Sequence, residues 1–569
     1  MCGVFFCVRH SKDDSPALLE LCGRLQYTNG ARGPDSQGTQ RISVTGPDEL
    51  NHAALTLDLY ASELRLRGIA PIVQPHEQDG NVFCWNGEIF DGMEISKEEN
   101  DGVKLFRALR ALETLEQVCD LFGRIEGPYA FVYYHAASRR VLFARDPLGR
   151  RSLLIHRPTI ENPYFLLASV STGSDPACEF QEVSTEYIYC LELLDLIASN
   201  FDSALAKLPR SSGAGTLYSQ LCSVNTTLPP DDWPVITSLE TPGYLTQAVD
   251  DFIARLDRSV ELRVRNVPQP SIREFGAQTT DQSVAGIDCT TLAFLAHKHL
   301  PPDEPIDLLN VAFENPRKVK LQAGETGSKS KKKHPTSAVE PRPLYMVPDR
   351  VTGLQEVEEL RRLCPRVWNF VSPLHPFDES QQAIPVIEAL MFPAKTVMDL
   401  SLALALYFAS RGKGQIRRYP GADGVTYTTP AKVLLNGLGS DELLGGYGRH
   451  RTAYGSGGWK GVIDELQLEI DRIPSRNLGR DDRVISSHGK ETRHPFLSLS
   501  IVSFLANLPV HLKMDPRAET GLGDKMLLRS AARKMGLVEA SSRKKRAMQF
   551  GSHSARMDGE KRGDIPLKL

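Results

Sequence analysis

The pattern of hydrophobic and polar positions divides the chain into two parts of different texture. In the first part, short apolar or alternating runs separated by Gly, Pro and Asp lie at 81–90, 130–135, 139–146 and 163–169. Runs of this kind are typical of β-strands bounded by turns. Two helices are expected in the same part, near 16–25 and 103–112. The first part is therefore predicted to be rich in strands.

The second part alternates between helical and strand-like segments. Apolar residues at helical spacing predict an amphipathic helix over 244–264, through Ala248, Phe252, Leu256, Val260 and Val264. Further helices are expected at 290–300, 353–363 and 396–410, and strands at 306–313, 367–371 and 432–435. This βα alternation predicts a mostly parallel sheet with helices on both faces, so the fold class is α/β.

Length and local composition suggest the domain boundaries. A chain of 569 residues is too long for one ordinary core. The segments TTLPPDDWP and ETPG are typical of a linker, so we expect a first domain at 2–195, a linker at 196–243, a second domain at 244–555 and a tail at 556–569. Within the second domain, 315–343 contains GETGSKSKKKHP and few apolar side chains, which predicts a disordered insertion.

Bulk composition excludes several classes of function. The 67 basic and 70 acidic side chains give a net charge of -3, so no nucleic-acid surface is expected. The N-terminus lacks a secretory pattern, and the apolar run 397–410 is too short to cross a bilayer, so no membrane association is predicted. The 10 cysteines are scattered without a CxxC pair, which favours a reducing compartment, the cytoplasm. The sequence leaves the oligomeric state open.

Cys2 is a candidate nucleophile. Removal of Met1 would give it a free α-amine, and an α-amine of pKa about 7.7 can serve as a built-in base for the thiol. The alternative is that Cys2 is only a small apolar residue, as Cys7 is expected to be. Taken alone, Cys2 favours that alternative.

Polar residues that follow in order strengthen the catalytic interpretation. Arg32 can bind the α-carboxylate of a free glutamine, and Glu88 and Asp101 can bind its α-ammonium group. The Asn86 side chain and the Gly87 N–H can form an oxyanion hole at the end of a strand.

The motifs MCG, RGPD, NGEIF, GPYAFVYY and ARDPLGRRSL occur in this order within residues 1–153. In this order they resemble the class II glutamine amidotransferases. The resemblance implies an N-terminal-nucleophile (Ntn) α/β/β/α glutaminase sandwich. It assigns the nucleophile to Cys2, the oxyanion hole to Asn86 and Gly87, and glutamine binding to Arg32, Glu88 and Asp101.

A second group of motifs lies in the other half. An apolar strand leads into the loop Asn436-Gly437-Leu438-Gly439, and an acidic pair that includes Asp441 opens the next helix. Backbone N–H groups of such a loop suit phosphate, and Asp441 can hold Mg²⁺, although a simple strand–helix turn is an alternative. Charged clusters follow at 477–483, 491–497, 525–529 and 545–550, for which surface ion pairing is the alternative.

Together these segments resemble the synthetase domain of asparagine synthetases. The resemblance implies an α/β adenine-nucleotide alpha-hydrolase-like (PP-loop) domain that uses ATP and Mg²⁺. ATP would adenylate aspartate, and ammonia from glutamine would displace AMP, giving asparagine, AMP and pyrophosphate. The residues implied to contact ATP or pyrophosphate are Gly286, Asp288, Phe313, Asn436, Gly437, Asp441 and Lys525, with Asp288 and Asp441 as the Mg²⁺ ligands.

The sequence departs from this family at its nucleotide loop. The family pattern Ser-Gly-Gly-x-Asp-Ser falls on 284–289, where only Gly286 and Asp288 match, and 274–283 is too polar to predict a supporting strand. Leu438 also replaces a Glu, and Asn436 a Ser. Either the loop has lost its function or the sequence crosses a wrong splice boundary. Three hypotheses stay open: an amide ligase, a glutaminase with an inactive synthetase half, and a non-catalytic scaffold.

Overall fold

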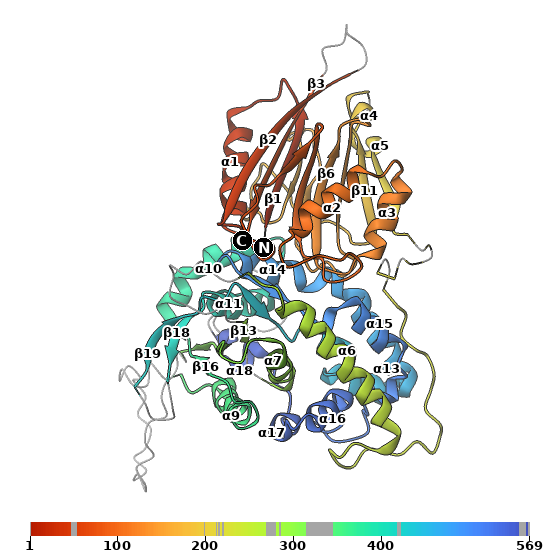
Figure 1. Cartoon of the computed structure of the whole chain (residues 1–569), viewed down its shortest axis with the longest axis vertical. Coiled ribbons are helices and arrows are strands. Elements are labelled where there is room, and N and C mark those ends of the chain that lie inside the picture. The colour runs from red at the N-terminus through yellow and green to blue at the C-terminus, as the bar shows by residue number, and fades with distance from the viewer. Residues whose placement is uncertain are drawn as a thin grey trace.

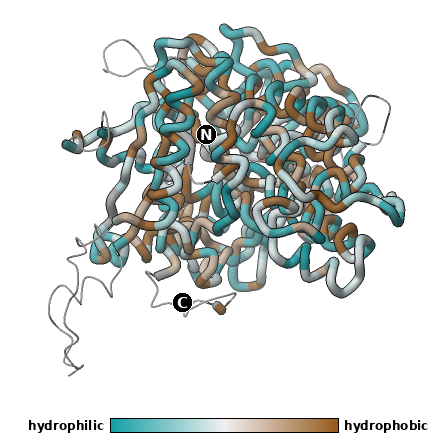
Figure 2. The backbone as a smooth tube through the Cα atoms, turned by 90° about the horizontal axis from the view of Figure 1, so that it is seen from below, coloured by the Kyte–Doolittle hydropathy of each residue, from teal (hydrophilic) through white to brown (hydrophobic). Residues whose placement is uncertain are grey.

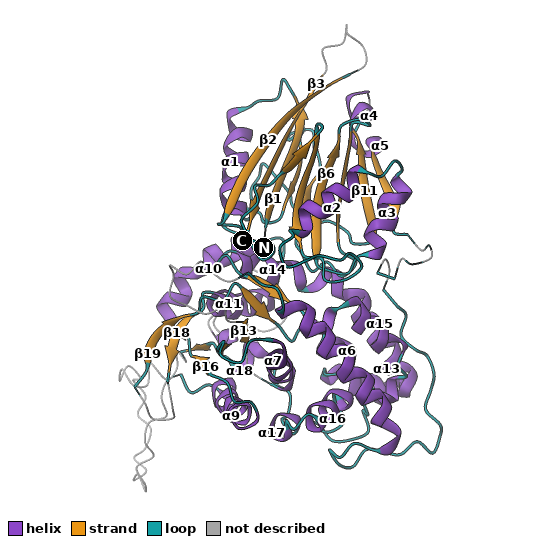
Figure 3. Cartoon of the chain, in the orientation of Figure 1, coloured by secondary structure: helices purple, strands orange, loops and turns teal. Residues whose placement is uncertain are grey.

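The computed structural model forms two domains that lie one above the other in Figure 1. Strands dominate the upper domain, and helices surround a smaller sheet in the lower one (Figure 3). The structure describes residues 2–46, 54–198, 200–211, 213, 215, 217–218, 221–268, 280–283, 286–314, 345–417, 423–556 and 565–566.

Two antiparallel six-stranded sheets build the first domain, in the orders β10-β8-β9-β1-β3-β2 and β12-β11-β7-β6-β5-β4. The first sheet contains β1 (Gly3–His10), β2 (Ser36–Thr45), β3 (Ala54–Glu63), β8 (Leu154–His156), β9 (Phe165–Ala168) and β10 (Gln181–Glu182). The second contains β4 (His76–Gln78), β5 (Asn81–Gly87), β6 (Tyr129–His135), β7 (Arg140–Arg145), β11 (Tyr187–Glu192) and β12 (Leu205–Pro209). Five helices accompany them: α1 (Pro16–Gly30), α2 (Asp101–Arg110), α3 (Leu115–Arg124), α4 (Leu193–Ala198) and α5 (Phe201–Ala204).

The side chains of β1 explain the layering of this domain. Successive residues of a strand point to opposite faces, and the run GVFFCV is apolar on both. Phe6 packs in the core between the sheets with Phe143, whereas Phe5 packs with Leu21 of α1 on the outside. On the outer face of the other sheet, Phe83 stacks on Phe106 of α2 at 5.8 Å. The predicted α/β/β/α sandwich is therefore confirmed.

Part of the segment expected as a linker, 196–243, belongs to this sandwich. α5 lies there, and β12 pairs antiparallel with β11 at the edge of the second sheet. β12 is a short strand of five residues and is partly exposed, as edge strands commonly are. The sandwich thus extends to Pro209, and the connection that follows leads to η1 (Gly243–Leu245).

A parallel five-stranded sheet, in the order β16-β14-β13-β20-β21, forms the centre of the second domain. Leu435 packs in the core on one face of this sheet, and Leu434 packs in the core on the other. The strands are β13 (Thr280–Ser283), β14 (Ile306–Leu309), β16 (Trp368–Val371), β20 (Val433–Leu435) and β21 (Glu491–Arg493). Two small sheets pair β15 (Ala312–Phe313) with β17 (Leu374–His375), and β18 (Lys413–Ile416) with β19 (Val425–Thr428).

Helices cover both faces of this sheet, as the βα alternation predicts (Figure 1). Hydrophilic and hydrophobic stretches are interspersed along the backbone (Figure 2). They are α6 (Thr246–Val264), α7 (Ile287–His299), α9 (Pro348–Leu363), α10 (Phe377–Met391), α11 (Val397–Ser410), α12 (Ser440–Leu444), α13 (Gly448–Arg476), α14 (Leu478–Ser486), α15 (Leu499–Asn507), α16 (Met526–Lys534), α17 (Val538–Ser541) and α18 (Met548–Gly551). Short 3-10 turns are η2 (Pro495–Leu497), η3 (Val510–Leu512) and η4 (Ser554–Arg556).

The expectation that no strand supports the nucleotide loop is wrong. β13 lies in the middle of the parallel sheet, with β14 on one side and β20 on the other. A central strand finds ladder partners for its backbone on both sides, and this context outweighs the low β-propensity of Asp and Gln. The segment 274–279 and residues 284–285 lie outside the described residues.

Other expectations fall partly outside the description. The predicted disordered insertion, 315–343, lies wholly outside the described residues. In the predicted tail, Pro566 forms an isolated bridge with Thr396 of the second domain. Over the part of the chain that is described, no helix is both long and apolar enough to cross a membrane.

Buried ion pairs join the two domains. Asp482 of α14 accepts hydrogen bonds from Arg32 Nη2 at 2.7 Å and from the Ser152 backbone N–H at 3.1 Å. Arg151, next to Ser152, forms an ion pair with Glu491 of β21 at 2.7 Å. The four charged side chains are at most 2% exposed. Because their partners lie across the boundary, these charges fix the position of one domain on the other.

A second group of charges crosses the same boundary. Glu126 of the first domain pairs with Arg150 at 3.0 Å and with Arg263 of α6 at 3.1 Å. Arg150 also donates to the backbone oxygen of Leu497, at 2.9 Å. An unpaired buried charge is costly, so each member of this network depends on the others.

Replacing Asp482 with leucine tests how much this interface contributes to the free energy of unfolding. We expect Asp482→Leu to lower the free energy of unfolding by about 3–5 kcal/mol, because Arg32 is left as a buried charge without its carboxylate. Asp250→Asn, which removes an exposed ion pair with Lys534, should change it by less than about 1 kcal/mol. Denaturant unfolding followed by fluorescence measures both, and equal effects would contradict the assigned role of Asp482.

Candidate functional site

Cys2 lies immediately before β1, at the junction of the two domains (Figure 1). Its side chain is 7% exposed, and burial raises the pKa of the thiol to about 12. The Cys2 backbone N–H donates to Asn86 Oδ1 at 3.1 Å, and Arg32 Nε donates to the Cys2 carbonyl at 3.1 Å. The structure therefore holds the Cys2 backbone from both sides and places it against the end of β5.

The hydrogen bond from Cys2 fixes the orientation of the Asn86 amide. Since the amide oxygen accepts from Cys2 N–H, the amide nitrogen must point the other way. Asn86 is fully buried, and its Nδ2 has no hydrogen-bond partner among the described residues. A buried donor without an acceptor suits the oxyanion of an acyl-transfer intermediate. Asn86 thus has the geometry that the sequence predicts for it.

Gly87 is a position where only glycine fits. A Cβ atom there would lie 2.6 Å from Trp85 Cζ2 and 2.9 Å from the Pro128 carbonyl oxygen. The close packing keeps this backbone next to the Asn86 amide at the end of the strand. It is consistent with the predicted use of the Gly87 N–H as a second donor.

The two predicted ammonium-binding carboxylates are close together and buried. Asp101, at the start of α2, accepts from the Ile89 and Gly102 backbone N–H groups at 2.9 and 3.0 Å. Burial, followed by the nearby charge of Glu88, raises the pKa of Asp101 to about 7. Glu88 forms an ion pair with Arg67 at 2.6 Å.

Arg67 was not predicted from the sequence. Its guanidinium group lies beside Glu88, donates to the Ile89 carbonyl at 3.2 Å, and has a pKa raised chiefly by Glu88 and then Asp101, against the effect of burial. The only sequence signal for Arg67 is that Leu64 and Leu66 alternate with Arg65 and Arg67. Both leucines are buried. A guanidinium beside two carboxylates is suited to a zwitterionic amino acid.

Arg32, predicted to hold the glutamine carboxylate, is instead engaged by the second domain. Its Nη2 bonds Asp482 at 2.7 Å and its Nη1 bonds Ser486 Oγ at 2.6 Å. The structure therefore brings Cys2, Asn86 and Gly87 together, and Glu88 with Asp101, but it gives Arg32 a protein carboxylate as its partner.

A second centre lies at the edge of the parallel sheet. The strand order reverses between β13 and β20, and ligands of open α/β sheets bind at the carboxyl ends of the strands at such a point. An open pocket of about 520 Å³ lies there and is lined by Gly286, Ile287, Asp288, Asp349, Thr352, Asp441, Lys525, Arg529, Arg543, Lys544, Lys545 and Arg546. Six basic side chains in one pocket suit a polyanion such as a polyphosphate.

Lys525 is the central residue of this pocket. It begins α16 with φ of 51° and is 1% exposed. Its Nζ lies 2.7 Å from carboxylate oxygens of both Asp288 and Asp441. Lys525 and Lys545 lower the pKa of Asp441 to about 2, so this carboxylate stays ionised at neutral pH. The predicted residues Asp288, Asp441 and Lys525 therefore form one cluster.

Two glycines allow this cluster to form. A Cβ at Gly437 would lie 2.8 Å from Asp288 Cβ, and one at Gly446 would lie 1.9 Å from Asp441 Oδ1. The glycine loop after β20 thus packs directly against the start of α7. This contact is the structural reason for Gly437.

The remaining predicted nucleotide contacts are less direct. Gly286, at the N-terminus of α7, donates its N–H to buried Glu356 at 3.2 Å, and burial raises the pKa of Glu356 to about 7. Asn436 Oδ1 accepts from the Leu438 N–H at 2.9 Å within its own loop. Phe313 does not line the pocket, because its ring packs edge-on to Phe408 in the core.

The carboxylates of Asp288 and Asp441 can be compared with the ligands that Mg²⁺ usually takes. This ion is usually held by one or two carboxylates, with phosphate and water oxygens completing its coordination. Asp288 and Asp441 supply such a pair, both within contact of the Lys525 ammonium group. Among the described residues, no cluster of three or more His, Cys, Asp or Glu side chains could hold a metal without further ligands. The pair therefore fits a Mg²⁺ ion that arrives with a phosphate chain.

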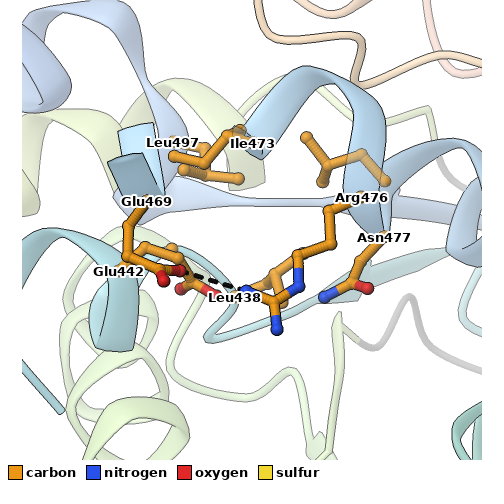
Figure 4. A pocket seen from close by; sticks show the side chains of 9 residues that line it. Leu438, Glu442, Glu469, Ile473, Arg476, Asn477 and Leu497 are labelled. Atoms are coloured by element: carbon orange, nitrogen blue, oxygen red, sulfur yellow. Dashed lines mark hydrogen bonds and ion pairs between the residues drawn. The ribbon is translucent and has the colours of Figure 1, made fainter. Parts of the chain in front are cut away.

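Leu438, which stands where the family has a glutamate, lines a smaller pocket of about 270 Å³ (Figure 4). The same pocket is lined by Glu442 of α12 and by Glu469 and Arg476 of α13. Glu469 pairs with Arg476 at 3.1 Å, and Glu442 accepts from the Tyr447 hydroxyl at 2.5 Å. Carboxylates are thus present in this pocket although residue 438 is apolar.

The segment from β21 to η2 contacts both centres. The Arg493 side chain lies 3.5 Å from Glu88 in the first domain, while its carbonyl accepts from the Asn436 N–H at 2.9 Å in the second. Four residues later, Leu497 packs so closely on Gly439 that a Cβ there would lie 2.4 Å from it. One short segment therefore touches both the Asn86–Glu88 turn and the glycine loop.

Comparisons with known proteins agree with this division into two centres. Residues 1–189 match the family model described as a glutamine amidotransferase domain, and residues 455–564 match the asparagine synthase model. The chain is 35% identical to asparagine synthetase domain-containing protein 1 of Bos taurus, over 98% of this chain and 95% of that protein. It is 34% identical to the protein of the same name from Homo sapiens, over 98% and 95%. A putative glutamine-hydrolyzing asparagine synthetase of Methanocaldococcus jannaschii is 31% identical over 22% of each chain.

The basic pocket predicts a measurable affinity for polyphosphate that depends on Lys525. We expect Lys525→Met to weaken the binding of inorganic pyrophosphate at least about tenfold, because Asp288 then faces the anion without its cation and Asp441 keeps only Lys545. Lys534→Met removes an exposed lysine of the same helix and should change the affinity less than about twofold. Isothermal titration calorimetry measures both. Unchanged affinity of Lys525→Met would exclude this pocket as the polyphosphate site.

Proposed function

Because the chain belongs to the family of asparagine synthetase domain-containing proteins, we propose that it is a glutamine-dependent amidotransferase. Glutamine is hydrolysed at Cys2, and the ammonia is transferred to an aspartate that ATP has activated, giving asparagine, AMP and pyrophosphate. The observation that carries the proposal is the Cys2–Asn86 contact, which holds the backbone of the candidate nucleophile against an amide whose buried nitrogen has no acceptor among the described residues. All 10 cysteines are free thiols, and the proposal places the protein in the reducing cytoplasm.

In the first centre, the α-amine of Cys2, exposed when Met1 is removed, takes the proton of the thiol. The sulfur attacks the carboxamide carbon of glutamine, and the oxyanion is held by Asn86 Nδ2 and the Gly87 N–H. The proton passes to the leaving nitrogen as ammonia departs, and water then hydrolyses the thioester to glutamate. Glu88 and Asp101 bind the α-ammonium group.

The α-carboxylate of glutamine can be bound in two ways. Arg67 already lies beside Glu88, so it can bind the carboxylate without a change at the domain boundary. Arg32 can do so only if it releases Asp482. The first arrangement leaves the buried interface intact, and we therefore assign the carboxylate to Arg67 and the support of the Cys2 backbone to Arg32.

In the second centre, the basic pocket binds the phosphates of ATP. Lys525 neutralises charge on the departing pyrophosphate, and Lys545 acts beside it on Asp441. Bound Mg²⁺, held by Asp288 and Asp441, would supply further neutralisation of the phosphate charge. The segment from β21 to η2 touches both centres and therefore holds them in a fixed position relative to each other.

A glutaminase with an inactive synthetase half is the second candidate. Specific observations favour it: Leu438 cannot take a proton, and the Gly286 N–H, which would face a phosphate, is bonded to Glu356. Pyrophosphate release that depends on aspartate separates this candidate from the ligase.

Cys2→Ala tests the catalytic assignment. We expect glutamate release to fall at least about 10³-fold, because the nucleophile is removed, while pyrophosphate release supported by ammonium chloride and aspartate persists. Cys7→Ala is the matched control, since Cys7 is a buried thiol on β1 and its loss should retain activity within about threefold. Glutamate is measured by a coupled dehydrogenase assay.

The outcomes of this experiment separate the three hypotheses. Loss of glutamate release with pyrophosphate release preserved supports the ligase. Glutamate release by the wild-type protein without any pyrophosphate release leaves the glutaminase. If neither product forms from a chain that begins at Cys2, the protein is a scaffold.

Processing of the N-terminus gives an independent prediction. A variant with a bulky residue inserted between Met1 and Cys2 retains its methionine, so Cys2 has no free α-amine. We expect its glutaminase activity to be below about 1% of that of the processed chain, because the amide nitrogen cannot act as the base. Intact-mass spectrometry verifies the terminus, and full activity with Met1 retained would refute the proposed role of the amine.

A further inference from the structure

Gln74 lies in the connection between β3 and β4 and is 2% exposed. Its side chain makes two contacts. Gln74 Oε1 accepts a hydrogen bond from the Trp85 backbone N–H at 2.9 Å, and Gln74 Nε2 lies 3.7 Å from Cys2 Sγ, within hydrogen-bond reach of sulfur. None of the sequence motifs includes this residue, and the proposed mechanism does not use it.

The orientation of the Gln74 amide follows from its partners. A backbone N–H can only donate, so the group that faces Trp85 must be the amide oxygen. The amide NH₂ is then directed at the sulfur. Trp85 precedes Asn86 on β5, so one strand end orients both the donor to the sulfur and the donor to the oxyanion.

The backbone around Gln74 is held firmly. The Ile72 N–H donates to the Glu63 carboxylate at 2.6 Å, two residues before Gln74. On the other side, a Cβ at Gly38 would lie 2.5 Å from the Gln74 carbonyl oxygen, so β2 packs directly on this connection. A donor fixed in this way costs little reorganisation when charge develops next to it.

The site needs such a donor. Burial opposes ionisation of the Cys2 thiol, and the thiolate is the nucleophilic form. Besides Gln74, the Leu64 backbone N–H lies within hydrogen-bond reach of the sulfur and acts to lower the pKa of the thiol, while the carboxylates of Glu63 and Glu491 act to raise it. We propose that Gln74 is a catalytic residue, whose side-chain amide donates to the sulfur of Cys2 and stabilises the thiolate that attacks glutamine.

The proton and electron balance of the step is simple. The thiol proton moves to the α-amine, the S–C bond forms as the carbonyl π pair moves to oxygen, and Gln74 exchanges no proton. Its hydrogen bond is strongest to the thiolate and weakens once the sulfur is a neutral thioester. The inference rests on the proposed function only in taking Cys2 as the nucleophile.

Two substitutions at Gln74 separate this role from a structural one. Gln74→Leu removes both contacts, whereas Gln74→Glu keeps an oxygen acceptor for the Trp85 N–H but sets a carboxylate against the sulfur. If Gln74 served only to hold Trp85, the glutamate variant would resemble the wild type and the leucine variant would be impaired. A donor to the thiolate requires the opposite order, with glutamate worse than leucine.

We expect kcat for glutamine hydrolysis to fall about 10-fold to 100-fold in Gln74→Leu, with KM changed less than about threefold, as for loss of a hydrogen bond to a charged group. In Gln74→Glu the fall should exceed that of Gln74→Leu at least about tenfold at pH 8. Gln37→Leu is the control, because Gln37 bonds Tyr60 in the same domain and does not contact Cys2. Thermal unfolding is measured for each variant.

The rate at which iodoacetamide alkylates Cys2, followed by mass spectrometry from pH 6 to 10, gives a readout that does not require glutamine turnover. The midpoint of the profile should shift upward in Gln74→Leu and further in Gln74→Glu. If Gln74→Glu reacts as fast as the wild type, or faster than Gln74→Leu, the inference is overturned. If the shifts occur but the wild-type protein hydrolyses no glutamine, the proposed function fails while the role of Gln74 toward the thiolate stands.

Discussion

The structure depends on the buried contact between Asp482 and Arg32. This pair crosses the domain boundary at 2.7 Å with almost no solvent exposure, so the two charges satisfy each other only while the domains stay in contact. The same carboxylate accepts from the Ser152 N–H, and Arg32 in turn supports the carbonyl of Cys2. The position of the nucleophile, the turn that follows β7 and the placement of α14 are therefore parts of one electrostatic assembly. This arrangement means that the first centre is completed by residues of the second domain.

Lys525 has the corresponding position in the second centre. It balances two carboxylates in the absence of ligand, and its own placement needs an αL backbone and two glycines that bring the loops within contact. A nucleotide that binds there exchanges an internal ion pair for contacts with phosphate, so charge is redistributed rather than newly buried. Since the β21–η2 segment also touches this loop through Asn436, a change at one centre has a short covalent route to the other.

The sequence allowed the prediction of those features that depend on local pattern or on ordered motifs. Helix α6 follows from apolar spacing, and the sandwich and the Cys2–Asn86 pair follow from the motif order. β13 could not be predicted, because its strand character comes from ladder partners more than 20 residues away in the chain rather than from its own Asp and Gln. Gln74 carries no periodic signal and Arg67 only the alternation of two leucines with two arginines, so the importance of both comes from the side chains that folding places beside them. Asp482 belongs to a charged cluster whose partner lies 450 positions earlier, a separation that no local window can detect.

The burial of Cys2 at the domain junction has a consequence for biosynthesis. Asp482, which pairs with Arg32, and Glu491, whose charge acts on the Cys2 thiol, leave the ribosome long after the N-terminus has emerged. Under the proposed function, the timing of Met1 removal is therefore set against the folding of the second domain: trimming that occurs during synthesis acts on Cys2 before its buried surroundings have formed.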